Sequence, residues 1–202
     1  MGSVVKQIGR LTMNNSMLFV CDIQEKFRNN IQHFDAMVEN TSRLLKAFHI
    51  LGMPVVCTEQ YPKGLGHIVP ELELEKYGIK PVAKTQFSMC VPEVVAALKK
   101  QGATNVVLCG IEGHVCVQQT TLQLLEDSGV SVHLVADAVS SRSMTDRLLA
   151  LQRMRDSGAF VTTTEAVVLG LAGGSSNPNF KDLQKIIMEP SADTGLLQYL
   201  KM

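Results

Sequence analysis

The sequence predicts an α/β fold in which a parallel sheet is covered by helices on both faces. Between residue 17 and about residue 170, short apolar runs alternate with amphipathic segments of helical length. The chain has 202 residues, which suits one such domain with a sizeable core, and no internal repeat or linker interrupts the pattern. We therefore expect a single domain over 1–202, with 1–16 as a lead-in and 175–202 as a helical tail that packs on the domain.

Six apolar runs are predicted to form the strands. Each is short, apolar and bounded by polar or turn-forming residues, as buried strands are. In chain order the expected strands are 17–21, 54–58, 81–84, 105–109, 131–135 and 159–162.

Helices are predicted between these strands because apolar residues recur there at helical spacing. The clearest is 35–51, where Met37, Leu44 and Phe48 form an apolar face and Gly52 ends the helix. Further helices are expected over 91–101, 116–128 and 144–157.

The last part of the chain is expected to be helical as well. Thr164 is predicted to cap a helix that ends before the turn-forming stretch 173–176. Apolar residues then recur at helical spacing in the tail, at Phe180, Leu183 and Ile186. The stretch 59–80, by contrast, is rich in Gly and Pro and is expected to be an irregular loop beside a pocket.

The charge balance points to a small-molecule partner. Nineteen basic residues match nineteen acidic residues, and neither sign forms a long run, so we expect no nucleic acid as a partner. The apolar runs are too short to span a bilayer and the N-terminus lacks the apolar core of a signal peptide. We therefore expect no membrane association and a cytoplasmic protein.

The five cysteines do not suggest a disulfide framework or a zinc site. They are odd in number and form no C-x-x-C pair. Cys21, Cys57 and Cys109 lie within or at the end of apolar strand-like runs, where a thiol is most simply a small buried apolar group. Cys116 differs because it lies just beyond a strand, at the predicted start of a helix.

Three chemically capable residues lie at the carboxyl ends of three different predicted strands: Asp22, Lys84 and Cys116. In an open parallel sheet, ligands bind beyond the carboxyl ends of the strands. A helix N-terminus and a nearby cation favour the thiolate form of a cysteine, and an aspartate in reach can take its proton. Taken singly, an aspartate after a strand is as often a turn residue, a lysine there is as often solvated, and a lone cysteine is as often a packing group. The presence of all three at strand ends favours a nucleophilic site.

Three stretches resemble a known family. They are 19–27 (FVCDIQEKF), 82–88 (VAKTQFS) and 109–120 (CGIEGHVCVQQT), with weaker likeness at 137–142 and 162–165. Together they are similar to the isochorismatase-like cysteine hydrolases, which include nicotinamidases, N-carbamoylsarcosine amidases and ureide hydrolases, and most of all to the eukaryotic isochorismatase-domain-containing members. The resemblance covers nearly the whole chain.

The resemblance implies a fold and a site. It implies a six-stranded sheet with order 3-2-1-4-5-6 in a three-layer α/β/α arrangement, and an Asp22, Lys84 and Cys116 triad. It also implies a cis peptide between Ile111 and Glu112, with the backbone N–H groups of Glu112 and Cys116 forming an oxyanion hole.

Residues that flank the three strand ends are expected to line the substrate pocket: Phe27, Tyr61, Phe87 and Gln119. The specificity loop, 59–80, carries no transferable motif. A neighbouring subunit is one way to complete such a loop, so we expect a homo-oligomer.

No metal and no cofactor are expected. Nicotinamidases carry an Asp-x-His metal cluster in the loop after strand two. The corresponding loop here offers only Glu59 and His67, and two isolated ligands of this kind are more often unrelated surface groups than a metal site. Gly64 and Gly66 lack the third glycine of a dinucleotide fingerprint. His114 is retained only as a modulator of the thiol.

The leading hypothesis is a metal-independent hydrolase in which Cys116 attacks a small amide or ureide through a thioester. Isochorismatases themselves cleave a vinyl ether without a nucleophilic cysteine, which gives one alternative. The other is a protein-interaction module with weak or lost catalysis. The physiological substrate does not follow from the sequence.

Overall fold

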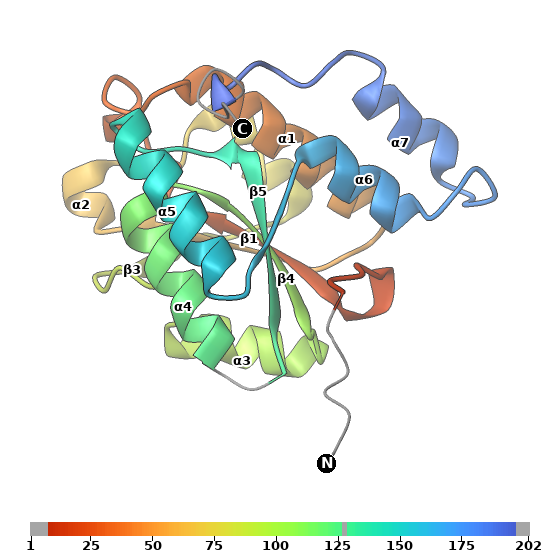
Figure 1. Ribbon diagram of the computed structural model, residues 1–202, viewed down its shortest axis with the longest axis horizontal. Coiled ribbons are helices and arrows are strands. Elements are labelled where there is room, and N and C mark those ends of the chain that lie inside the picture. Colours follow the sequence, from red (N-terminus) through yellow and green to blue (C-terminus); the bar gives the residue numbers. More distant parts are fainter. Residues whose placement is uncertain (1–7, 127–128, 197–202) are drawn as a thin grey trace.

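The computed structural model describes residues 8–126 and 129–196 and contains a six-stranded parallel sheet (Figure 1). The strand order is β3-β2-β1-β4-β5-β6, which confirms the predicted parallel sheet and its order. The strands are β1 (Ser16–Cys21), β2 (Val55–Gln60), β3 (Val82–Lys84), β4 (Asn105–Gly110), β5 (Ser131–Val139) and β6 (Phe160–Thr162).

Helices cover both faces of this sheet (Figure 1). On one face, α3 (Pro92–Gln101), α4 (Gln118–Glu126) and α5 (Met144–Asp156) share an apolar core with the strands. On the other face, α1 (Phe34–Ile50) and α6 (Thr164–Ala172) pack on a second core. Every residue of β1 and β4 is buried, as expected for strands covered on both sides.

Several boundaries differ from the sequence prediction. Strand β5 continues to Val139, four residues beyond its predicted end at 135, because Ala136, Ala138 and Val139 are also buried. The helix predicted over 116–128 is preceded by a π-helical turn, Gly113–Val117, and α4 starts at Gln118; residues 127 and 128 lie outside the described residues.

The cap of α6 and the loop after β2 also correct the prediction. Thr163, not Thr164, caps α6, since its hydroxyl accepts a hydrogen bond from the Ala166 N–H. The stretch predicted to be irregular contains three short helical turns, where Pro starts two of them and limits their length. They are α2 (Pro62–Leu65), Pro70–Leu72 and Leu74–Tyr77.

The C-terminal part lies against the sheet's α1 side. Helix α7 (Phe180–Ile187) packs beside α1 and α6 (Figure 1), with the Leu183 side chain fully buried between them. Beyond α7 the chain returns across α1, where the Asn40 amide donates to the Ala192 carbonyl over 3.4 Å. Residues 197–202 of the predicted tail lie outside the described residues.

Strand order brings β1 and β4 side by side at the point where the winding direction of the sheet reverses. Their register pairs Cys21 at the end of β1 with Gly110 at the end of β4. The segments that leave these two strands therefore start next to each other, at the position where open α/β sheets bind ligands.

Candidate active site

A buried ion pair lies at the carboxyl end of the sheet. The Lys84 Nζ atom is 2.6 Å from Asp22 Oδ2, and both side chains are almost completely shielded from solvent. Asp22 follows β1 directly and has a φ of 51°, a left-handed conformation that Asp tolerates better than most residues. This turn leaves the carboxylate facing β2 and β3, where Thr58 and Lys84 lie.

Each atom of this ion pair has further polar partners. Asp22 Oδ1 accepts a hydrogen bond from the Thr58 hydroxyl over 2.7 Å. Lys84 Nζ donates to Gln60 Oε1 over 2.7 Å and to the Phe87 carbonyl over 2.8 Å. Buried charges are stable only when they are satisfied in this way, so Thr58 and Gln60 hold the pair in place. Neither residue was predicted from the sequence to belong to the site.

The surroundings of Lys84 favour its charged form. Burial opposes the charge, but the acidic groups of Cys21, Asp22 and Cys116 outweigh burial and raise the pKa of the Lys84 ammonium above its ordinary value. Lys84 is therefore a fixed positive charge beside the two thiols.

Cys116 lies in the π-helical turn between β4 and α4, with 7% of the residue exposed. The turn packs against the end of β1, since the Ile111 N–H donates to the Cys21 carbonyl over 2.9 Å. Only glycine fits at position 110, where φ is 117° and a methyl group would stand 2.1 Å from the Cys21 carbonyl oxygen. The peptide bond between Ile111 and Glu112 is cis.

Cys21 is a member of this site that the sequence analysis treated as packing alone. Its Sγ atom donates to Asp22 Oδ2 over 3.6 Å, and the Cys116 thiol lies close to it. Burial, the Cys116 thiol and the Asp22 carboxylate raise the pKa of Cys21 well above its ordinary value. Its position at the end of β1, next to Asp22, was the one feature that pointed to it.

The segment that follows β5 holds the turn before Cys116. Arg142 donates from Nη2 to Glu112 Oε1 over 2.8 Å and from Nε to Glu112 Oε2 over 3.1 Å. The Gly113 N–H donates to the Ser140 carbonyl. These contacts fix the backbone that the resemblance assigns to an oxyanion hole.

His114 contacts the same segment rather than the thiol. Its Nδ1 atom lies 3.1 Å from the Ser141 hydroxyl. The structure thus gives the histidine a partner in the loop after β5, and the expectation of a modulating role for it remains a prediction.

The four predicted pocket residues differ in their exposure to solvent. Tyr61 and Phe87 are about half exposed, at 54% and 49%, and their backbones bond to Lys84 through the Tyr61 N–H and the Phe87 carbonyl. Phe27 is partly buried against the α1-side core, and Gln119 is exposed at the start of α4. Their contact with substrate stays a prediction.

Glu59 and His67 pair with each other. The His67 Nδ1 atom is 3.2 Å from Glu59 Oε2, and Glu59 Oε1 accepts from the Ile68 N–H. Within residues 8–126 and 129–196, no group of three or more His, Cys, Asp or Glu side chains is arranged to hold a metal ion. In the same ranges, no helix has both the length and the apolar content to cross a bilayer.

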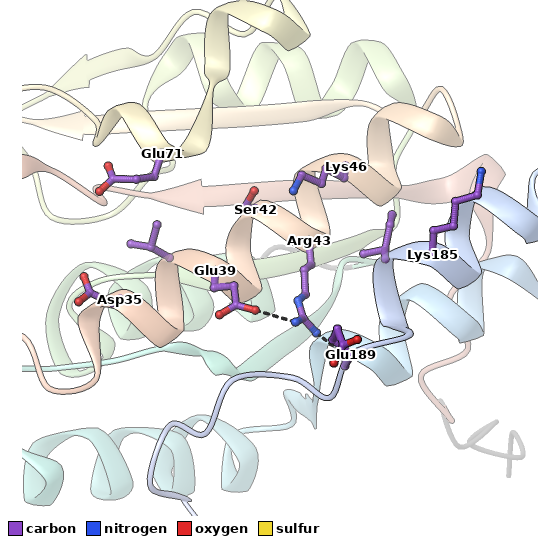
Figure 2. Close-up of a pocket in the computed structure, with 10 residues that line it drawn as sticks. Asp35, Glu39, Ser42, Arg43, Lys46, Glu71, Lys185 and Glu189 are labelled. Carbon is purple, nitrogen blue, oxygen red and sulfur yellow. Dashed lines mark hydrogen bonds and ion pairs between the residues drawn. The ribbon is translucent and has the colours of Figure 1, made fainter.

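A cavity of about 720 Å³ lies away from the strand ends, between α1 and α7 (Figure 2). In its lining, Arg43 donates to the Glu39 carboxylate over 2.6 Å and to the Glu189 backbone carbonyl over 3.0 Å. None of its lining residues is a cysteine. This cavity is therefore separate from the strand ends where Asp22, Lys84 and Cys116 lie.

Comparison with known proteins adds a family match. Residues 16–166 match the isochorismatase domain. The chain is 53% identical over 193 residues to isochorismatase domain-containing protein 2 of Danio rerio, covering 95% of this chain and 96% of that protein.

Two solved structures illustrate the shared fold. A structure described as the MAR1 ribonuclease of Caenorhabditis elegans is 51% identical, with a TM-score of 0.88 over 93% of this chain and 97% of that one. The YcaC gene product of Escherichia coli, described as an octameric hydrolase of unknown specificity, is 24% identical, with a TM-score of 0.82 over 90% of this chain and 92% of that one.

Proposed function

The chain belongs to the isochorismatase family of hydrolases, and on this premise we propose that it is a metal-independent cysteine hydrolase that cleaves a C–N bond in a small amide or ureide. The observation that carries the proposal is the buried Asp22–Lys84 pair, 2.6 Å apart, directly beside the Cys116 turn. A charged pair is costly to bury, and a nucleophilic thiol in the same crevice gives it a chemical use.

In the proposed reaction Asp22 takes the Cys116 proton, and the thiolate attacks the substrate C=O. The backbone N–H groups of Glu112 and Cys116 stabilise the oxyanion, and one such donor contributes about 3 kcal/mol to lowering a barrier. Asp22 then protonates the leaving nitrogen, which departs and leaves a thioester on Cys116. Water, activated by Asp22, hydrolyses the thioester and regenerates the thiol.

Lys84 pairs with the Asp22 carboxylate in this scheme and supplies a positive charge beside the thiolate. Tyr61 and Phe87 are the proposed aromatic rim of the pocket. Their exposed side chains suit contact with a substrate or with a second copy of the chain. We infer a homo-oligomer, and light scattering during gel filtration measures its mass directly.

The decisive experiment screens small amides, ureides and enol ethers and traps the covalent adduct by mass spectrometry. Cys116→Ala is expected to lose turnover and the adduct while keeping the native circular dichroism spectrum. Cys109→Ala is the matched control, because Cys109 is also buried, in β4 just before the Cys116 turn, but belongs to the core on the opposite face of the sheet. An unchanged rate in Cys116→Ala would rule the mechanism out.

RNA cleavage is the second candidate, favoured by the description of the 51%-identical Caenorhabditis elegans structure as a ribonuclease. It ranks below amide hydrolysis because the chain has no net charge with which to attract a polyanion. The same screen includes an RNA oligonucleotide.

Enol-ether turnover that survives Cys116→Ala but not Asp22→Asn would instead indicate vinyl-ether chemistry.

A further inference from the structure

Two thiols meet in the crevice, and the proposed hydrolysis uses only one. Cys21 and Cys116 belong to the same apolar core, on the α3, α4 and α5 side of the sheet, and the Cys116 thiol lies close enough to raise the pKa of Cys21. Cys21 is fully buried, whereas 7% of Cys116 is exposed. Of the two residues, only Cys116 therefore has any contact with solvent.

The backbone holds the two cysteines together independently of their side chains. Cys21 is paired in register with Gly110, and its carbonyl accepts the Ile111 N–H over 2.9 Å. The absence of a side chain at Gly110 permits this approach. The turn that carries Cys116 is also fastened from the far side by Arg142, so the thiols stay neighbours in the folded protein.

We propose that Cys116 and Cys21 form a reversible intramolecular disulfide when a hydroperoxide oxidises Cys116. The proposal rests on the proposed function only in taking Cys116 as the reactive thiol of the crevice. Its consequence is a modification site that blocks the nucleophile under oxidising conditions and protects it from irreversible oxidation.

The reaction balances in two steps. In the first, the Cys116 thiolate attacks the terminal oxygen of the hydroperoxide; an S–O bond forms, the O–O bond breaks, and the alkoxide or hydroxide that leaves takes a proton. Sulfur loses two electrons and the peroxide gains them, which gives a sulfenic acid. In the second, the Cys21 sulfur attacks the Cys116 sulfur, hydroxide leaves and is protonated to water, and the disulfide forms.

Asp22 is placed to assist the second step. Cys21 Sγ already donates to Asp22 Oδ2 over 3.6 Å, so the carboxylate lies where the Cys21 proton has to go as its sulfur attacks. Cys57 and Cys109 lack this arrangement because both belong to the core on the opposite face of the sheet. A disulfide between Cys116 and either of them would have to cross the sheet.

The test exposes the full-length protein to hydrogen peroxide and maps its cysteines by peptide mass spectrometry without reduction. The expected product is one peptide pair joined through Cys21 and Cys116, with a loss of two hydrogens that dithiothreitol reverses. In Cys21→Ser, which retains a donor toward Asp22, Cys116 is expected to gain two or three oxygens irreversibly. Cys109→Ser is the matched control and is expected to behave as the unaltered protein does.

Irreversible oxidation of Cys116 in the unaltered protein, at the same rate as in Cys21→Ser, would overturn the proposal, as would a disulfide to another cysteine. Cys21→Ala provides a second variant if Cys21→Ser does not fold. Because the readout is covalent mass, a failure to find an amide substrate leaves this result intact, and an absent disulfide leaves the hydrolase assay intact.

Discussion

Two buried charged regions lie at the carboxyl end of the sheet, and they use their charges differently. In the Asp22–Lys84 region the two charged groups contact each other directly, at 2.6 Å. In the second region, between α5 and β5, the fully buried Arg147 donates to the backbone carbonyls of Ala136 and Thr194 rather than to a carboxylate. The Asp137 carboxylate there accepts hydrogen bonds from the backbone N–H and hydroxyl of Thr164.

The pKa values follow this difference. Nearby acidic groups raise the pKa of Lys84 in spite of burial. Burial lowers the pKa of Arg147 to about 10, with only partial compensation from Asp137. Arg147 and Asp137 therefore serve mainly to fasten α5, α6 and the C-terminal chain to β5, whereas Asp22 and Lys84 maintain a charged crevice beside a thiol.

The largest expected effect comes from removing the cation in each region. Lys84→Met leaves Asp22 buried without its partner, so the free energy of unfolding should fall by about 3–5 kcal/mol and turnover by about 10²- to 10³-fold. Arg147→Met leaves carbonyls unpaired and should cost about 2–4 kcal/mol, with turnover per folded molecule unchanged. Urea unfolding and the initial rate measure the two quantities.

The rate of Cys116 alkylation by iodoacetamide supplies a second readout that needs no substrate. It should fall in Lys84→Met and stay constant in Arg147→Met. Equal losses of turnover and alkylation in both variants, at a temperature where both are folded, would contradict the division into a chemical and a structural region.

An intermediate effect is expected from His133, a buried residue near the start of β5 and away from both charged regions. Burial lowers its pKa to about 4, so the unfolded chain takes up the proton first as the pH falls below about 6.5. Stability should therefore decline between pH 6.5 and pH 4, by about 2 kcal/mol from pH 7 to pH 5.

His133→Gln separates this contribution from the other titrating groups. Its amide can still bond Asn105, which lies 3.3 Å from His133 Nε2. Urea unfolding at pH 7 and pH 5 should give a smaller decline in this variant than in the unaltered protein. A decline of the same size in both would assign the pH dependence to other residues.

The smallest expected effect compares one hydroxyl in each region. Thr58 donates to Asp22 over 2.7 Å and Thr164 donates to Asp137 over 3.0 Å. Replacing either by Val should lower the free energy of unfolding by about 1.5 kcal/mol, the contribution of a hydrogen bond to a charged group. Only Thr58→Val should also reduce turnover, by about tenfold. An equal loss of turnover in Thr164→Val would contradict the division into a chemical and a structural region.

Much of this architecture is predictable from local patterns. Apolar runs located all six strands, because a strand buried on both faces must be apolar along its length. The end of β5 was misplaced because Asp137 interrupts the apolar run, and its partner Thr164 lies on a distant helix. The α6 cap was misplaced by one residue because Thr163 and Thr164 are both good caps.

By itself the sequence determined the strands and most of the helices, because each depends on neighbours along the chain. It also located Asp22 after β1, Lys84 at the end of β3 and Cys116 in the turn after β4. Only the tertiary structure decided which groups surround them. Thr58, Gln60 and Cys21 became partners of Asp22, Lys84 and Cys116 through strand order and register. Such contacts depend on backbone distances between remote segments, which no local pattern encodes.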